Sequence, residues 1–241
     1  MMAWLHTDKG SVVLMEKKKF IIGKIILIIL AIIILGILIH TTRNYIIISK
    51  LQDTFKQYAN VDNYHIKIAY DNEQVGHVET NYYRKDNKKA YFIENTNLSG
   101  DITKMLTFDN GKRVDFFSDS IEGKNAYLGK GASPDFAIDN GIMVDSFIQK
   151  LFCCFVARIR SMEYNGKDCY EIKNFLTANY LYDENEVSMS IIDKETALEI
   201  ARKWDGTRLQ LEERLTEINT VDDSVFIEPN IAEYDIKENN T

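Results

Sequence analysis

The segment NYHIKIAY, residues 63–70, decides the fold, because apolar side chains recur there at every second position. Successive side chains of a β-strand point to opposite faces of the sheet, so this period of two predicts a strand with one buried face. The same alternation returns at Val78, Thr80 and Tyr82. The chain beyond residue 60 is therefore expected to build a β-sheet.

Upstream of this segment the apolar period changes from two to between three and four. The residues that carry it are Tyr45, Ile48, Leu51, Phe55 and Tyr58. Such spacing places them on one face of an α-helix. We therefore expect residues 40–60 to form an amphipathic helical stalk whose apolar face packs on the sheet.

Further upstream, residues 20–39 read FIIGKIILIILAIIILGILI, with Lys24 as their only charge. At 1.5 Å per residue, a helix of this length covers about 30 Å, the thickness of the hydrocarbon core of a bilayer. Lys24 lies one turn from the start, where its aliphatic stem lets the ammonium group reach the headgroups. The segment is predicted to be a transmembrane anchor.

The charges around this anchor predict its orientation. Lysines occupy positions 17–19 before the span, whereas only Arg43 follows it closely. Positive charge marks the cytoplasmic side, so we expect residues 1–19 in the cytoplasm and the C-terminal part outside the cell membrane. A cleaved signal peptide is the alternative. Its apolar run is usually about 7–15 residues long, and residues 40–43 make a poor cleavage site.

The chain is thus expected to contain a cytoplasmic N-terminus (1–19), an anchor (20–39), a stalk (40–60), an extracytoplasmic β domain (61–237) and a tail (238–241). Only two prolines occur in 241 residues, which leaves no proline-rich linker to divide the outer part. Residues 1–14 lack any period, and Met15 followed by Glu16 and the lysines looks like an ordinary start of such an anchor. We therefore expect Met15 to be the initiator and residues 1–14 to be untranslated.

Turn signals separate a series of short strands after residue 71. The Asn110-Gly111 pair supplies the positive φ angles of a tight hairpin, and Asn165-Gly166 is a second pair of this kind. The strands expected between turns are residues 90–95, 103–108, 113–117, 169–172, 178–182, 186–192 and 198–204. Residues 209–218 fit a hairpin strand or a helix, and the short link to the preceding strand favours the strand.

One helix is expected to interrupt this meander, over residues 142–159. Its apolar stripe consists of Phe147, Ile148, Leu151, Phe152, Phe155 and Val156. An apolar stripe has to be buried, so we expect it to cover the concave side of the sheet. The predicted fold class is therefore mainly β (α+β): an N-terminal transmembrane helix, then a curved antiparallel sheet, or half-barrel, packed on one or two helices.

Composition and motifs argue against several functions. With 36 acidic and 29 basic residues the net charge is −7, which disfavours binding to nucleic acid. Catalytic and nucleotide-binding motifs are absent from the sequence, and His65 and His77 fall in the polar phase of strands, where solvent-facing imidazoles are expected. We therefore expect no enzyme activity, no cofactor and no metal.

Three cysteines, Cys153, Cys154 and Cys169, are too few for a zinc site or a disulfide framework. In an oxidising compartment Cys169 could pair with Cys153 or Cys154. Buried free thiols are the alternative, and the sequence leaves both readings open.

The chain contains 13 Tyr and 12 Phe, many of them on expected strands. Most must be core residues, but a curved sheet under a helix can also enclose a cavity for acyl chains or an apolar peptide. The candidate pocket residues are Phe92, Phe108, Phe116, Tyr127, Phe147, Leu151 and Trp204.

Four stretches resemble a known superfamily: NGKDCYEI (165–172), YDEN (182–185), IIDKETAL (191–198) and NTVDDSVFIEP (219–229). Their rhythm of strand, turn and strand, ending in an acidic residue and proline, is similar to the LolA/LolB-like extracytoplasmic domains. These include lipoprotein carriers and receptors and the stress-sensor domains that regulate anti-sigma factors. The chain departs from the pattern at Ala197, where a turn glycine is usual, and at Glu199, where proline often follows.

The resemblance implies a membrane-anchored, non-enzymatic binding domain of the cell envelope, for lipid acyl chains or lipoprotein. An uncleaved anchor favours a fixed station over a shuttle. The alternative is an envelope sensor or scaffold domain that binds another protein.

Overall fold

The computed structural model describes residues 9–119, 123–128, 135–139, 141–144, 146–175, 186–205 and 211–238. Side chains are described for these residues except 9–20, 119, 186–188, 204, 205 and 238. The chain forms two compact units, residues 1–43 and residues 44–241. Each unit is described by itself below.

The first unit contains most of helix α1 (Lys9–Phe55). Its segment from Ile21 onward has a mean hydropathy of 3.2 over its most apolar window, and the side chains of that window are exposed. Among the described residues, this is the one helix long and apolar enough to cross a membrane. It is a possible membrane anchor.

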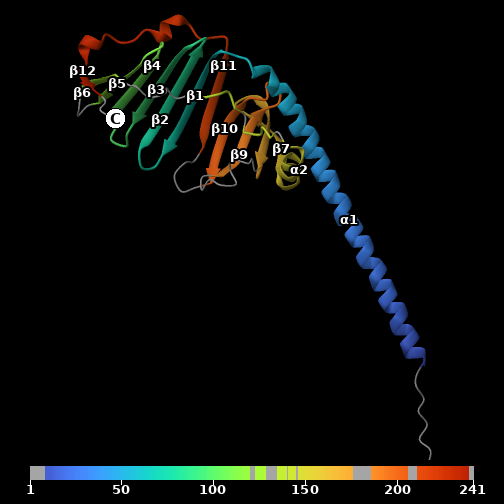
Figure 1. Ribbon diagram of the computed structural model, residues 1–241. Coiled ribbons are helices and arrows are strands. Elements are labelled where there is room, and N and C mark those ends of the chain that lie inside the picture. Colours follow the sequence, from blue (N-terminus) through green and yellow to red (C-terminus); the bar gives the residue numbers. More distant parts are fainter. Residues whose placement is uncertain are drawn as a thin grey trace, which may run out of the picture. The chain divides into compact units, whose positions relative to one another are not determined.

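The second unit is built on an open sheet of twelve described strands, in the order β12-β6-β5-β4-β3-β2-β1-β11-β10-β9-β8-β7 (Figure 1). Neighbouring strands are antiparallel except β12, which pairs with β6 in parallel. The strands are β1 (Asn63–Asn72), β2 (Gly76–Lys85), β3 (Lys88–Thr96), β4 (Ile102–Asp109), β5 (Arg113–Asp119), β6 (Gly123–Leu128), β7 (Arg158–Tyr164), β8 (Lys167–Lys173), β9 (Glu186–Asp193), β10 (Glu199–Asp205), β11 (Glu212–Ile218) and β12 (Asp235–Glu238). The predicted fold class is confirmed.

The predicted hairpin turns are present. Gly111 joins β4 to β5 with a φ of 97°, and Asn165 and Gly166 join β7 to β8 with φ angles of 49° and 74°. At Asn165 and Gly166, positive φ at both central residues gives the tight hairpin that matches the twist of the strands. The β4–β5 loop is residues 110–112, and Asn110 has no positive φ, so the expectation of positive φ at both residues of the Asn110-Gly111 pair was wrong. Residues 212–218 form β11, so the hairpin reading of this segment is confirmed over the helical one. The strand expected at 178–182 lies outside the described residues.

One face of the sheet, here called the helix face, is covered by the end of α1, by α2 (Phe147–Val156) and by residues 135–139 and 141–144. The end of α1 is tied to its neighbours by polar side chains. The Asn44 amide donates to the carbonyl oxygens of Cys154 and Ala157, both at 2.9 Å, and the Gln52 amide donates to that of Ile142 at 2.7 Å. Strand residues buried on this face include Tyr64, Ile66, Tyr82, Ile159, Ile172 and Ile192.

The opposite face, here called the tail face, is covered by the C-terminal segment, residues 221–234, which includes the short helices η2 (Asp223–Phe226) and η3 (Ile231–Glu233). This cover packs on the part of the sheet formed by β2–β6. Its buried cluster is Ala90, Phe108, Val114, Phe116, Ala126, Val221 and Phe226. The sheet therefore has buried side chains on both faces, and not on one face as the alternation in the sequence predicts.

Helix α2 differs from its prediction in length and in orientation. Ser146 caps its start through its hydroxyl, and Ala157 is already extended, so the chain enters β7 at once. The side buried against the sheet carries Cys153 and Cys154, whereas the predicted apolar stripe is exposed. The expectation that this stripe covers the sheet was wrong. The spacing of apolar residues identifies the apolar side of a helix, but it does not determine which side packs on the sheet.

Candidate functional site

Three of the seven predicted pocket residues lie together on the tail face. The ring centroids of Phe92 and Phe108 are 5.4 Å apart, and those of Phe108 and Phe116 are 5.8 Å apart. Tyr234 of the C-terminal segment closes this row with its ring 4.9 Å from that of Phe116. The aromatic row is therefore packed by the chain's own residues.

The other four residues lie elsewhere. Tyr127 follows Ala126 on β6, so it points to the face opposite the aromatic row. Phe147 and Leu151 are on the exposed side of α2. The backbone of Trp204 belongs to β10, and its side chain is outside the described ones. A ligand pocket made of these seven residues stays a prediction.

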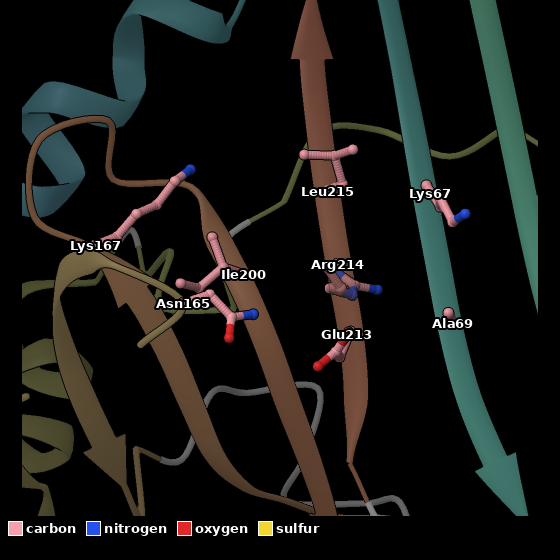
Figure 2. Close-up of a pocket in the computed structure, with 8 residues that line it drawn as sticks. All are labelled: Lys67, Ala69, Asn165, Lys167, Ile200, Glu213, Arg214 and Leu215. Atoms are coloured by element: carbon pink, nitrogen blue, oxygen red, sulfur yellow. The ribbon is translucent and has the colours of Figure 1, made fainter. Parts of the chain in front are cut away.

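An open groove of about 350 Å³ lies on the tail face, beyond the reach of the C-terminal segment (Figure 2). Strands β1, β10 and β11 and the β7–β8 turn form it. Its apolar contributors are Ala69, Ile200 and Leu215, and its polar ones are Lys67, Asn165, Lys167, Glu213 and Arg214. Apolar side chains in a hollow with hydrogen-bonding groups at its rim are typical of a binding site.

The charges at the groove have partners on the protein. The Lys67 ammonium lies 2.6 Å from a carboxylate oxygen of Glu79, and the Tyr164 hydroxyl donates to Glu213 at 3.1 Å. The hydrogen bond from Lys67 is the main cause that holds the pKa of Glu79 below its ordinary value. Burial, followed by the hydrogen bond to Glu213, raises the pKa of Tyr164. These groups are fixed in place and suited to directional contacts.

A polar network borders the groove along β1, β2 and β11. The Nδ1 atom of His65 is 2.9 Å from Glu217 Oε2, and its Nε2 atom is 2.8 Å from Asn81 Oδ1. The imidazole stacks on the ring of Tyr83 at 4.3 Å, with 6° between the planes. His65 is therefore buried, and the expectation that it faces solvent was wrong. Cross-strand neighbours cover it, and a single strand's alternation does not reveal them.

An apolar cluster on the same face adjoins the groove. Cys169, Ile191 and Ala201 are its buried members, and Ile200 joins both the cluster and the groove. The Cys169 thiol donates to the carbonyl oxygen of Lys167 at 3.4 Å, and burial raises its pKa. A thiol held in its protonated form is a poor nucleophile.

The other two cysteines belong to the core of the helix face. Burial raises the pKa of Cys153, and it raises that of Cys154 to about 11. All three cysteines are free and buried, so the reading as buried thiols holds and the disulfide alternative does not.

A cluster of charged side chains is buried on the helix face, and no pattern in the sequence indicates it. The Glu199 carboxylate accepts hydrogen bonds from Arg202 Nε at 2.9 and 3.0 Å and from Arg214 Nη1 at 3.1 Å. Arg214 also pairs with Glu212, and Arg202 Nη2 reaches Asp139 at 3.2 Å. The cluster ties the described segment 135–139 to β10 and β11 through Asp139, so its role is to hold the cover of this face.

Among the described residues, no group of three or more His, Cys, Asp or Glu side chains is placed to hold a metal ion. The groove's ionisable groups are engaged with protein partners, and the thiol beside it is protonated. What the groove can do is accept an extended segment, with an apolar side chain against Ile200 and Leu215 and polar contacts at its rim.

No protein-family model and no curated protein sequence matches the chain. Among solved structures, it is similar to a chain in the complex structure of Pseudomonas aeruginosa MucA/MucB, with 11% identity, a TM-score of 0.31, and coverage of 77% of this chain and 62% of that one. It is also similar to a chain in the crystal structure of MucB in complex with MucA(peri), with 12% identity, a TM-score of 0.27, and coverage of 72% and 58%. This chain therefore spans about three fifths of the length of the chains it matches.

Proposed function

We propose that the protein is a membrane-anchored, extracytoplasmic binding domain that acts on another protein as an envelope sensor or scaffold and catalyses no reaction. The apolar segment of α1 provides the anchor, and the lysines at 17–19 support a cytoplasmic N-terminus. The sheet domain then lies outside the membrane. The groove on the tail face is its binding site.

The open groove is the observation that carries this proposal. An acyl chain needs a largely apolar cavity that encloses it. The aromatic row that could line such a cavity is packed by Tyr234 of the chain's own C-terminal segment. The groove instead combines an apolar floor at Ile200 and Leu215 with a rim of amide, ammonium and carboxylate groups. That combination suits a polypeptide, which presents backbone polar groups and apolar side chains together.

Site-specific photocrosslinking in the native membrane tests the proposal. A benzophenone amino acid at Leu215, in the groove, is expected to capture one discrete protein. The matched control is Leu128 on β6, because the two leucines are 45% and 47% exposed. A protein adduct at Leu215 that is absent at Leu128 supports the groove as the binding site.

A groove variant makes the test sharper. Ile200→Glu places a carboxylate against the apolar floor and is expected to lower the yield of the Leu215 adduct at least about tenfold, since an unpaired buried charge disfavours docking. Ile227→Glu, which adds the same charge at an exposed isoleucine outside the groove, serves as the matched charge control. Lipid adducts alone at Leu215, or equal protein adducts at both leucines, would contradict the proposal.

A further inference from the structure

Helix α2 presents a second surface that the proposed function does not use. Five apolar side chains on one side of this helix are between 42% and 78% exposed. They are Phe147, Ile148, Leu151, Phe152 and Phe155. Their spacing of three and four residues makes them one continuous stripe along the helix. An exposed apolar stripe of this kind marks contact with a protein or with a membrane.

The chain itself limits how far this stripe can lie from the bilayer. The ring of Phe147 packs edge to face on that of Tyr45, with 6.2 Å between centroids. Tyr45 follows Ile39, the last residue of the predicted anchor, by six residues. Six residues reach about 9 Å as a helix and about 20 Å when fully extended. The start of α2 is therefore tethered within reach of the headgroup layer in any arrangement of the two units.

The charges near the stripe fit a lipid surface. The Lys150 ammonium lies 4.8 Å from the centre of the Tyr45 ring, and Arg158 follows the end of the helix with an exposed side chain. The segment from Phe147 to Val156 contains no acidic residue. Aromatic and aliphatic residues on one side of a helix, with basic residues beside them, are typical of helices that lie in the membrane interface.

We propose that α2 is a second membrane contact, and that its apolar stripe lies in the boundary between headgroups and acyl chains of the bilayer that holds the anchor. This inference rests on the proposed anchorage of α1. Docking of α2 fixes the sheet domain at the membrane surface by two points, which limits its rotation about the anchor. The groove is then presented to partners in a restricted orientation.

Fluorescence quenching by lipids tests this contact in the full-length chain. The protein is reconstituted in nanodiscs of equal parts phosphatidylcholine and phosphatidylglycerol, with lipids that carry a nitroxide near the headgroup. A fluorophore is attached to Ile148→Cys, and the wild-type chain serves as the labelling blank because its three cysteines are buried. Ile227→Cys on the C-terminal segment is the matched control, since Ile148 and Ile227 are 78% and 72% exposed.

The expected result is quenching at Ile148→Cys about twofold or more above that at Ile227→Cys, because the stripe is held within the nitroxide layer. Phe152→Asp in the Ile148→Cys chain is expected to reduce the signal to the control level. A label at Ile32→Cys, inside the apolar segment, reports on the anchor itself in parallel nanodiscs whose lipids carry the nitroxide on the acyl chain. Quenching at Ile32→Cys without quenching at Ile148→Cys overturns the α2 contact and leaves the anchorage standing. No quenching at Ile32→Cys overturns both.

An unquenched label at Ile148→Cys whose emission is nevertheless shifted to the blue also overturns the inference. That outcome places the stripe against protein, such as a second copy of the chain, and the oligomeric state in the nanodisc then identifies the occupant.

Discussion

The two faces of the sheet are covered in different ways. On the helix face, regular elements and residues 135–139 and 141–144 lie over aliphatic and tyrosine side chains and are tied down by buried polar groups such as Asn44 and Arg202. On the tail face, an irregular segment lies over a row of aromatic rings and ends before β1, β10 and β11. The tail segment also has polar ties, since the Asn110 amide donates to the carbonyl oxygen of Phe226 at 3.1 Å and Lys85 pairs with Asp223 at 2.9 Å. These ties are part-buried or exposed, whereas those of the helix face are buried, so the tail cover depends more on apolar area. The groove exists because the second kind of cover stops short.

The largest effect is expected from breaking the polar ties of the helix face. Arg202→Met removes one of the two guanidinium partners of Glu199, whose side chain is fully buried. Removing one partner of a buried ion pair costs about 3–5 kcal/mol, because the remaining charge stays desolvated. Urea denaturation of the full chain in detergent micelles, followed by circular dichroism, measures the loss.

A surface pair on the other side of the molecule provides the control. Lys124 and Glu233 lie 3.3 Å apart and are both more than half exposed, so Lys124→Met should cost less than about 1 kcal/mol. Equal losses for Arg202→Met and Lys124→Met would show that the helix face does not depend on its polar ties.

The tail face is expected to depend on single aromatic side chains. Phe226→Ala removes a buried ring from the cluster beneath the C-terminal segment and should cost about 3 kcal/mol. Ile227→Ala changes the next residue, which is exposed, and should cost less than about 0.5 kcal/mol. Denaturation midpoints compare the two variants, and limited proteolysis shows whether the segment has come loose. Comparable stability of both would mean that the segment does not depend on Phe226.

The sequence predicts the strands, the hairpins and the apolar helix because each of these leaves a local period or a turn pair. It does not predict the cover of the tail face, since residues 221–234 follow no period. It also misses the groove, because Lys67, Ile200 and Leu215 are brought together only by the pairing of β1 with β11 and of β11 with β10. The burial of His65 depends on the same long-range register.

Lowering the pH is expected to weaken the hydrogen bonds of Asp135 on the helix face and so to lower the stability of the protein. The hydrogen bond from Lys89, at 2.9 Å, is the main cause that holds the pKa of Asp135 below its ordinary value of 3.8, and the Tyr82 hydroxyl adds a second one at 3.0 Å. A depressed carboxyl pKa contributes stability above the unfolded-state pKa, and that stability is lost as the pH falls through the folded-state value. Asp135 is half exposed, so the contribution should stay below about 1 kcal/mol.

Asp135→Asn tests that direction. The variant should be less stable than the wild type at neutral pH; the difference should begin to shrink near the ordinary aspartate value of 3.8 and vanish below the lowered pKa of Asp135 in the folded state. Denaturation curves at a series of pH values measure it. A difference that stays constant down to acid pH would assign the loss to shape and not to charge.

The smallest effect is expected at Ala197, where this chain has alanine in a turn that favours glycine. Ala197 is fully buried on the helix face and has a φ of 59°, a conformation that costs a residue with a Cβ atom about 1 kcal/mol. Ala197→Gly relieves this strain, but it removes a buried methyl group worth about 0.8 kcal/mol and adds unfolded-state entropy worth about 0.4–1 kcal/mol, so the net loss should stay below about 1 kcal/mol. Ala201 on β10 is equally buried, in the tail-face cluster, and its φ is not positive. Ala201→Gly should therefore cost about 1–2 kcal/mol, because it loses the methyl group and gains unfolded-state entropy with no strain to relieve. If thermal unfolding gave equal losses at both positions, the left-handed turn at Ala197 would carry no strain, and the departure from glycine there would have no energetic consequence.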